Sequence, residues 1–217
     1  RSKILCCALV FRESLEMSFE KNGYVVMKNF ISKEIASLSS HYLMQRGEVH
    51  KIFRDNNLIS PFDNRFGVFG DEQVPNVFCL YGDPLTDTIM KLMTPEVEQA
   101  SKRKLIPNYT YCRIYEKGCD LKRHRDRLAC EISGTIFLGG DPWPIFIDPT
   151  GSTKGKGKKI VLKEGDALFY KGNLLDHWRE PFEGNICIQT FIHYNTTTTP
   201  NAKNFDGRPC LGFPIID

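Results

Sequence analysis

Lys122-Arg123-His124-Arg125-Asp126-Arg127 is the stretch around which this 217-residue chain is organised. It contains a His-x-Asp pair, and a later histidine, His177, follows another β-rich segment. Residues two apart on an extended strand share a face, so His124 and Asp126 can point to the same side. Two histidines and one carboxylate form the facial triad that binds a divalent metal and leaves other coordination positions open. We therefore take His124, Asp126 and His177 as candidate metal ligands.

The sequence on both sides of this stretch predicts short strands separated by turns. Aromatic and β-branched residues, which are enriched in strands, fill residues 109–115, 128–138, 167–170 and 185–194. Turn-forming glycine, proline and aspartate residues separate them at 139–142, 148–151, 164–166 and 183–184. Strands and turns at this spacing favour a sandwich or a double-sheet jelly roll.

The first half of the chain predicts supporting helices. A short β-rich run at residues 23–30 precedes Ser32, which is suited to N-cap a helix. The apolar face of that helix is predicted to carry Ile35, Leu38, Tyr42 and Leu43.

A long loop and a second helix are expected next. Residues 46–76 mix charges, proline and glycine around four phenylalanines, which indicates a loop that can cover a site. Asp83-Pro84 should begin a helix and Thr94-Pro95 should restart it, because both pairs combine an N-cap residue with proline at the first helical position.

Composition is ordinary for one globular domain, with 41% hydrophobic and 25% charged residues. The net charge of +3 is small and no long basic run lies on a predicted helix, which gives little support for a polyanion, so no nucleic-acid partner is expected. Eight scattered cysteines without CxxC spacing predict a reduced, cytoplasmic protein, although an even count also leaves a secreted, disulfide-bonded protein open. The apolar run from Ile4 to Phe11 is too short to span a bilayer, so no membrane partner is expected.

The order of these features resembles the iron(II)- and 2-oxoglutarate-dependent dioxygenases, specifically their prolyl-hydroxylase-like branch. The resemblance covers about residues 105 to 195, with a looser echo in the first helix. The features that match the family, in chain order, are Tyr115, Gly118, His124-Arg125-Asp126, Gly165-Asp166, His177, Pro181 and Gly184.

The resemblance implies an α+β fold with a mainly β core. Residues 105–197 would form a double-stranded β-helix, a cupin-like jelly roll. Residues 1–104 would supply helices and loops that buttress one sheet, and residues 198–217 an irregular tail, all within one structural domain. The implied activity uses Fe(II), 2-oxoglutarate and O2, with ascorbate as reductant, to hydroxylate a prolyl or related side chain of a protein or peptide. Succinate and carbon dioxide are the implied by-products.

The chain departs from the family where the 5-carboxylate of 2-oxoglutarate should be anchored. Members of this branch usually carry a lysine or arginine on the strand after the distal histidine, whereas residues 185–189 contain no cation. A carboxylate in a dry pocket needs a charged partner. Arg113 is our first candidate and Arg179 our second. The residues expected beside them are Tyr111, Gln189 and Tyr115, which stands where the family has a 2-oxoglutarate-binding tyrosine.

Other function classes fit the same residues. A non-enzymatic cupin-like module would bind a metal or small ligand without consuming 2-oxoglutarate, and a small-molecule or nucleic-acid oxygenase would share the fold. His193 is a reserve ligand, whereas His41 and His50 read as structural or surface residues. The side chains expected to line an open substrate mouth are Leu121, Trp143, Trp178 and the loop near Phe62.

Overall fold

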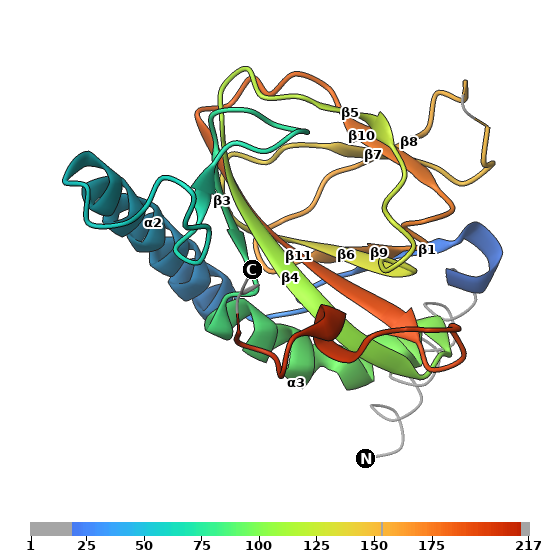
Figure 1. Cartoon of the computed structure of the whole chain (residues 1–217). Coiled ribbons are helices and arrows are strands. Elements are labelled where there is room, and N and C mark those ends of the chain that lie inside the picture. Colours follow the sequence, from blue (N-terminus) through green and yellow to red (C-terminus); the bar gives the residue numbers. More distant parts are fainter. Residues whose placement is uncertain (1–18, 153, 214–217) are drawn as a thin grey trace, which may run out of the picture.

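Two β-sheets face each other in the computed structural model, which describes residues 19–152 and 154–213 (Figure 1). The larger sheet has seven strands in the order β1-β9-β6-β11-β4-β3-β2, and the smaller has four in the order β5-β10-β7-β8. All the paired strands run antiparallel. This architecture is the double-stranded β-helix, so the predicted fold class is confirmed.

From β4 to β11 the strands alternate between the two sheets, except that β7 and β8 both belong to the smaller one. The larger sheet comprises β1 (Tyr24–Met27), β2 (Val68–Phe69), β3 (Phe78–Tyr81), β4 (Leu105–Glu116), β6 (Ile132–Gly140), β9 (Ala167–Tyr170) and β11 (Ile186–Thr196). The smaller sheet comprises β5 (Leu121–His124), β7 (Ile145–Asp148), β8 (Lys158–Ile160) and β10 (Asp176–Arg179). Because β1, β2 and β3 belong to the first 104 residues, that region supplies strands as well as helices.

Helix α2 (Lys33–Asp55) begins as predicted, but only part of its predicted apolar face packs on the core. The Ser32 hydroxyl accepts a hydrogen bond from the Ile35 N–H at 3.3 Å, which makes Ser32 the N-cap. Ile35 and Leu38, expected in the core, are 45% and 64% exposed. Leu43 is buried as predicted and Tyr42 packs against the core, and Ala36 and Ser40 are buried beside them. Small side chains are needed there because the helix approaches closely: a Cβ on Gly139 of β6 would lie 2.8 Å from the Ser40 hydroxyl.

Two further expectations about the helices were wrong. Helix α2 continues to Asp55, so residues 46–55 are helical and the predicted loop begins later. Helix α3 (Pro84–Ser101) is capped by Asp83 as expected but runs without interruption through Pro95. The Thr94 hydroxyl donates to the Met90 carbonyl at 2.8 Å and so does not cap a new helix. Burial of Met90 and neighbouring side chains against the sheet holds the helix together across the proline.

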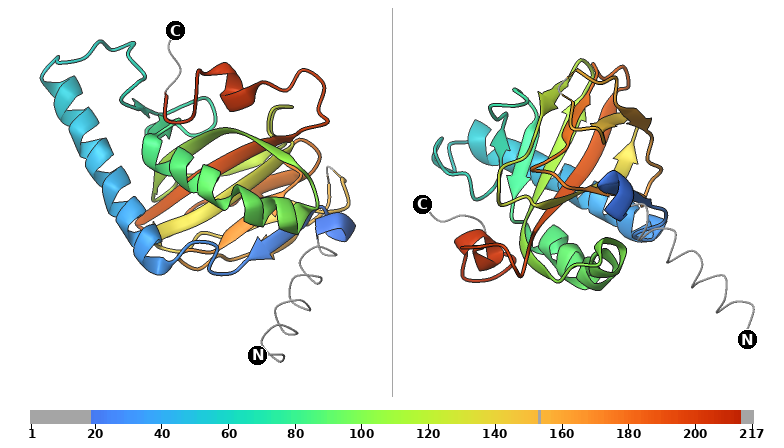
Figure 2. Two further views of the ribbon diagram at one scale, coloured as in Figure 1. Left: turned by 90° about the horizontal axis from the view of Figure 1, so that it is seen from below. Right: turned by 90° about the vertical axis from the view of Figure 1, so that its right-hand side faces the viewer.

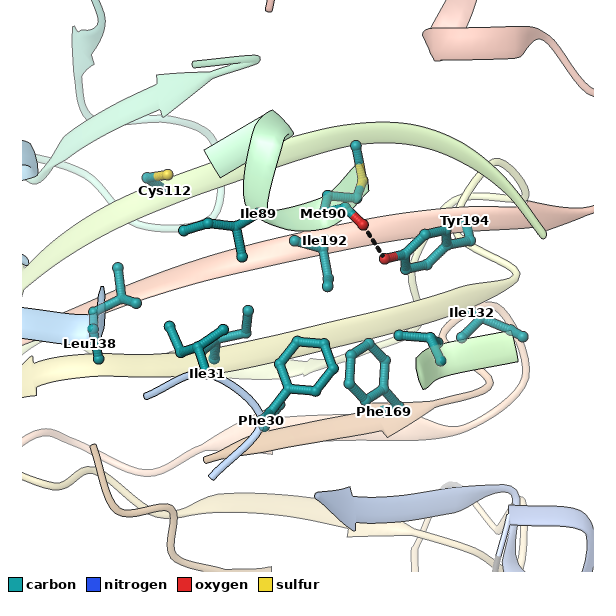
Figure 3. Packing of buried hydrophobic residues seen from close by; sticks show 14 of the residues in the cluster. Phe30, Ile31, Ile89, Met90, Cys112, Ile132, Leu138, Phe169, Ile192 and Tyr194 are labelled. Carbon is teal, nitrogen blue, oxygen red and sulfur yellow. Dashed lines mark hydrogen bonds between the residues drawn. The ribbon is translucent and has the colours of Figure 1, made fainter. Parts of the chain in front are cut away.

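Both helices lie on the outer face of the larger sheet, with α3 across β4 and β11 and α2 against β6 (Figure 2). The core between them contains Phe30 and Phe169, whose ring centroids are 5.0 Å apart (Figure 3). The Tyr194 hydroxyl of β11 donates to the Met90 carbonyl of α3 at 3.1 Å. A second apolar cluster, which includes Trp143 and Ile147, fills part of the space between the sheets. Apolar packing therefore supports the larger sheet on its outer face and joins it to the smaller sheet, which carries the candidate ligands.

After β11 the described chain is irregular apart from a 3-10 turn, η1 (Asn204–Gly207). Six cysteines, all of them free thiols, fall within the described residues. The remaining two cysteines and the apolar run from Ile4 to Phe11 lie outside those residues. None of the helices that the structure describes has the length and apolar character needed to cross a bilayer.

Candidate active site

The three predicted metal ligands converge between β5 and β10. His124 and His177 are direct register partners on these neighbouring strands, and their ring centroids are 4.2 Å apart. Asp126 follows two residues after β5. Its Oδ1 atom lies 3.7 Å from His124 Nε2 and 3.4 Å from His177 Nε2. The potential ligand atoms of the three side chains all lie within 4.8 Å of one another.

Both histidines present the nitrogen that a metal would need. His124 Nδ1 lies 2.7 Å from the Lys122 carbonyl, and His177 Nδ1 lies 3.0 Å from the Leu175 carbonyl. A carbonyl only accepts, so Nδ1 of each ring carries a proton, and in the neutral tautomer Nε2 is the nitrogen whose lone pair could bind a metal. Burial, together with the neighbouring His177, lowers the pKa of His124 and favours its neutral form. Such backbone contacts are the usual means of orienting metal-binding histidines.

Asp126 supplies the negative charge of the site. Burial by itself would raise the pKa of this carboxyl, but the interactions with His177 and Ser133 outweigh it and hold the pKa well below its usual range. Ser133 of β6 donates from its hydroxyl to Asp126 Oδ2 at 2.5 Å. The Asp126 N–H donates to the Gly172 carbonyl at 2.9 Å. Two imidazoles and one carboxylate therefore face the same point, which is the donor set of a facial triad.

A cavity of about 460 Å³ opens next to these three residues. Tyr111, Arg113 and Arg179, predicted to contact 2-oxoglutarate, line it. Tyr115 and Gln189 are buried behind this lining, where the Tyr115 ring packs edge-on against Trp143 with centroids 4.9 Å apart.

The predicted substrate mouth is correct only in part. Leu121 lines the cavity. Trp143 is buried behind the lining, and Trp178 stacks on Phe146 in the smaller sheet with centroids 5.5 Å apart. Phe62 is 93% exposed and does not reach the cavity. The loop before β3 still contributes through its polar residue Gln73, which lines the cavity.

Arg113, the first candidate for the carboxylate anchor, already has an anionic partner. Its guanidinium forms an ion pair with Asp71 and donates to Gln73 Oε1 at 2.9 Å. A further hydrogen bond runs from Nη1 to the Tyr115 hydroxyl at 3.3 Å. The positive charge of Arg113 is therefore balanced by a carboxylate from the loop before β3.

Arg179, the second candidate, is buried without a carboxylate partner among the described residues. The residue is 2% exposed. Nη2 donates to Gln189 Oε1 at 3.1 Å, Nη1 donates to the Trp143 carbonyl, and Nε has no partner in the described part of the chain. Burial lowers the pKa of this arginine. A buried guanidinium with an orphaned nitrogen and no counter-charge is a natural partner for an anionic ligand.

Sequence reasoning missed several residues of the site. Tyr170 of β9 lines the cavity, with its ring centroid 4.6 Å from that of His177. Asp206 of η1 also lines the cavity and accepts hydrogen bonds at 2.6 Å from Arg127 Nη2 and the Tyr81 hydroxyl. Tyr170 belongs to the strand predicted at residues 167–170, shortly before His177, so the sequence could have suggested it as a site residue. No local pattern marks Asp206, because contacts with residues far away in the sequence place it.

His193, the reserve ligand, lies on the other side of Asp126 from the histidine pair. It groups with Asp126 and Cys130 within possible ligand distance, and its ring stacks on Tyr109 with centroids 4.5 Å apart. Burial lowers the pKa of His193 to about 4, so this histidine is neutral near pH 7. His41 and His50 lie on α2, outside the cavity lining, as predicted for structural or surface residues.

Comparison with known proteins reveals the same fold in distant enzymes. No protein-family model matches the sequence, and neither does any curated protein. Among solved structures, a Pseudomonas putida prolyl-4-hydroxylase matches with a TM-score of 0.61 at 12% identity, covering 85% of this chain and 98% of that one.

Two other structures illustrate the range of the matches. A Trichoplax adhaerens prolyl hydroxylase, solved with a hypoxia-inducible-factor peptide, matches with a TM-score of 0.58 at 10% identity over 90% of this chain and 94% of its own. A non-heme α-ketoglutarate-dependent epimerase of nogalamycin biosynthesis matches with a TM-score of 0.63 at 13% identity over 96% of both chains. The chain therefore has the double-stranded β-helix fold of the Fe(II)- and 2-oxoglutarate-dependent oxygenases.

Proposed function

We propose that this protein is an Fe(II)- and 2-oxoglutarate-dependent dioxygenase that hydroxylates a C–H bond. The observation that carries the proposal is the convergence of His124, Asp126 and His177, with their Nε2 and Oδ1 atoms facing one another. Three ligands on one face would hold Fe(II) and leave the remaining positions for 2-oxoglutarate and O2. The neutral imidazoles and the single carboxylate also leave the bound ion one net positive charge, which favours an anionic oxo acid.

The residues around the cavity also fit 2-oxoglutarate. Arg179 is the better of the two candidate anchors, because Arg113 is neutralised by Asp71 whereas Arg179 has no carboxylate partner in the described residues. Gln189 Oε1 accepts from Arg179 Nη2 at 3.1 Å and from the Thr135 hydroxyl at 2.7 Å, which fixes the guanidinium in place. The Tyr170 side chain, on the cavity wall beside His177, would lie along the bound co-substrate.

Each group has a defined task in this scheme. Bound iron and 2-oxoglutarate would supply the oxidation: one atom of O2 enters succinate as carbon dioxide is released, and the other enters the substrate C–H bond. The triad would hold the metal, and Arg179 would hold the 5-carboxylate. The aromatic wall of Tyr109, Tyr111 and Phe191 would exclude water from the reacting carbon.

A prolyl or related side chain of a protein or peptide is the first candidate substrate, which the resemblance to the prolyl-hydroxylase-like branch supports. A free small molecule is the second. It is favoured by the cavity volume of about 460 Å³, which falls within the usual range of small-molecule sites, and by walls formed from two separate segments, at Gln73 and Asp206.

The test is stoichiometric succinate formation by the purified full chain with Fe(II), ascorbate, 2-oxoglutarate and O2. Proline-containing peptides, free amino acids, other small metabolites and oligonucleotides would be compared as substrates. His177→Ala and Asp126→Ala should abolish both Fe(II) binding and turnover, whereas His41→Ala on the exposed face of α2 should retain both. Metal binding without 2-oxoglutarate consumption would identify the cupin-like binding module instead, and full activity of Asp126→Ala would exclude the proposed site.

A further inference from the structure

The two oxygens of the Asp126 carboxylate have different surroundings. Oδ1 faces the Nε2 atoms of His124 and His177, at 3.7 and 3.4 Å. Oδ2 points away from them and accepts the hydrogen bond from the Ser133 hydroxyl at 2.5 Å. Ser133 is completely buried on β6, so water does not compete for this contact. One oxygen is therefore directed at the candidate metal position and the other at the protein.

His193 fixes the direction in which the Ser133 hydroxyl donates. Ser133 Oγ lies 3.1 Å from His193 Nδ1. The hydroxyl has one hydrogen, and an ionised carboxylate can only accept, so that hydrogen belongs to the bond with Asp126. His193 Nδ1–H must then donate to the serine oxygen. The result is a chain of donors from His193 to Ser133 to Asp126, in which Ser133 and His193 are buried and Asp126 is partly exposed at the cavity.

The backbone at Gly172 closes the space beside this chain of donors. A Cβ on Gly172 would lie 2.2 Å from Ser133 Oγ and 2.5 Å from Asp126 Oδ2, so only glycine allows such a close approach. The Gly172 carbonyl also accepts the Asp126 N–H at 2.9 Å. Both the backbone and the side chain of Asp126 are therefore held, and the carboxylate has little room to turn about its axis.

We propose that Ser133, oriented by His193, is a positioning residue that keeps Asp126 Oδ2 off the metal, so that Asp126 binds a divalent ion through Oδ1 alone. The inference rests on the proposed function in taking His124, Asp126 and His177 as the metal ligands. Carboxylates bind divalent ions through one oxygen or two, depending on what holds the second oxygen. A second oxygen on the ion would occupy a position that the co-substrates need.

The same hydroxyl separates the triad from a competing set of ligands. Asp126, Cys130 and His193 also lie within possible ligand distance of one another. Ser133 engages both Asp126 Oδ2 and His193 Nδ1, the two atoms that face each other across it. An ion is thereby directed to the side of Asp126 that carries His124 and His177.

Cobalt(II) is a suitable probe, because its visible absorption weakens as the coordination number rises and it can be measured without turnover. Wild type, Ser133→Ala, His193→Phe and His193→Asn would be titrated with Co(II) and then, as Co(II) complexes, with 2-oxoglutarate. Ser133→Ala should bind Co(II) about ten- to a hundredfold more weakly, as expected for loss of a group that orients a ligand. It should also show a weaker visible band and reduced affinity for 2-oxoglutarate.

The histidine variants separate orientation from simple packing. His193→Phe should change the Co(II) band in the same direction as Ser133→Ala but less, because the hydroxyl remains and only its orientation is lost. His193→Asn, whose amide can donate from about the place of Nδ1, should restore the wild-type band. Ser101→Ala is the matched control: it removes another buried hydroxyl, bonded to the Val97 carbonyl at 2.7 Å, on α3, and should leave both titrations unchanged.

A Ser133→Ala protein with the wild-type Co(II) band and wild-type affinity for 2-oxoglutarate would overturn the inference. So would a His193→Phe protein with an unchanged band. Wild-type protein that binds no Co(II) would instead remove the proposed metal site, and the inference with it, so the two failures are distinguishable.

Discussion

Arg179 on β10 donates a hydrogen bond from Nη2 to Oε1 of Gln189 on β11, at 3.1 Å, and so links the two sheets beneath the candidate metal site. Gln189 belongs to the stretch where the prolyl-hydroxylase-like branch carries its cation. Residues 185–189 contain no cation, and the guanidinium of Arg179 supplies a positive charge to this part of β11 from the opposite sheet. This relationship leads to the first prediction.

Arg179→Met should weaken 2-oxoglutarate binding to the Co(II)-loaded protein by roughly ten- to a hundredfold. A charge-assisted hydrogen bond contributes about 1.5–3 kcal/mol, and about 1.4 kcal/mol corresponds to a tenfold change in affinity. Co(II) affinity should hardly change, because the triad is untouched. Isothermal titration calorimetry with each ligand in turn measures both quantities.

Arg113→Met is the control for this prediction. Its effect on 2-oxoglutarate affinity should be smaller, because Asp71 already balances the charge of Arg113. If Arg113→Met weakened the binding more than Arg179→Met, the order of the two arginines expected from the sequence would stand after all.

The sequence predicted the fold and the three candidate ligands because local patterns carry both. Strands are marked by their side-chain types, and the His-x-Asp pair needs only its own extended backbone to share a face. Whether an arginine is free to bind an anionic ligand depends instead on which carboxylates lie near it in space. Asp71, 42 residues from Arg113, decides that this arginine is already paired, and no periodicity in the sequence reports that contact.

The packing face of α2 was predicted only in part, for a related reason. An apolar spacing identified Ile35 and Leu38 as core residues, but the close approach of β6 at Gly139 admits only small side chains. The depth of a helix on a sheet is set by the strand beneath it. Sequence reasoning about the helix alone therefore placed Leu43 correctly but put Ile35 and Leu38 on the wrong side.

Arg208→Met should lower the free energy of unfolding by about 3–5 kcal/mol, the usual loss when one partner of a buried ion pair is removed. Arg208 Nη1 donates to Asp87 Oδ2 at 2.8 Å, and the two side chains are only 3% and 1% exposed. The variant would leave the Asp87 carboxylate buried without its cation. Urea denaturation followed by circular dichroism measures the change.

The matched control is Arg65→Met, which removes the exposed ion pair with Asp63. Water and salt screen such an exposed pair, so this variant should unfold close to wild type. Equal losses in the two arginine variants would contradict the assignment of stability to the buried pair.

Gly134→Ala should destabilise the protein by about 1–3 kcal/mol through overpacking. A Cβ at this position of β6 would lie 2.4 Å from Phe169 Cε1 and 2.9 Å from Ile192 Cγ1. Combining the change with Phe169→Leu, which makes room, should recover part of the loss, and a double-mutant cycle of unfolding free energies gives the coupling. Strictly additive losses would show that the ring is not what excludes the methyl group.

His50 should make stability depend on pH in the mildly acidic range. The side chain is 2% exposed, lies between the rings of Phe69 and Phe78, and its Nδ1 atom has no partner in the described residues. Burial, with help from the nearby Arg54 and Arg46, lowers the pKa of His50 in the folded protein. The unfolded chain, with an ordinary histidine pKa of about 6.5, therefore takes up a proton before the folded one does.

Because the unfolded chain takes up the proton first, lowering the pH reduces the free energy of unfolding. The contribution of His50 to stability is fully present above about pH 6.5, the unfolded pKa, and is lost as the pH falls below it towards the lower folded pKa. In His50→Leu the free energy of unfolding should consequently fall less than in wild type when the pH is lowered from about 7.5 to about 5. His41→Leu, an exposed histidine on the same helix, serves as the control and should keep the wild-type slope. Parallel curves for wild type and His50→Leu would mean that the pKa of His50 is the same in the folded and unfolded states.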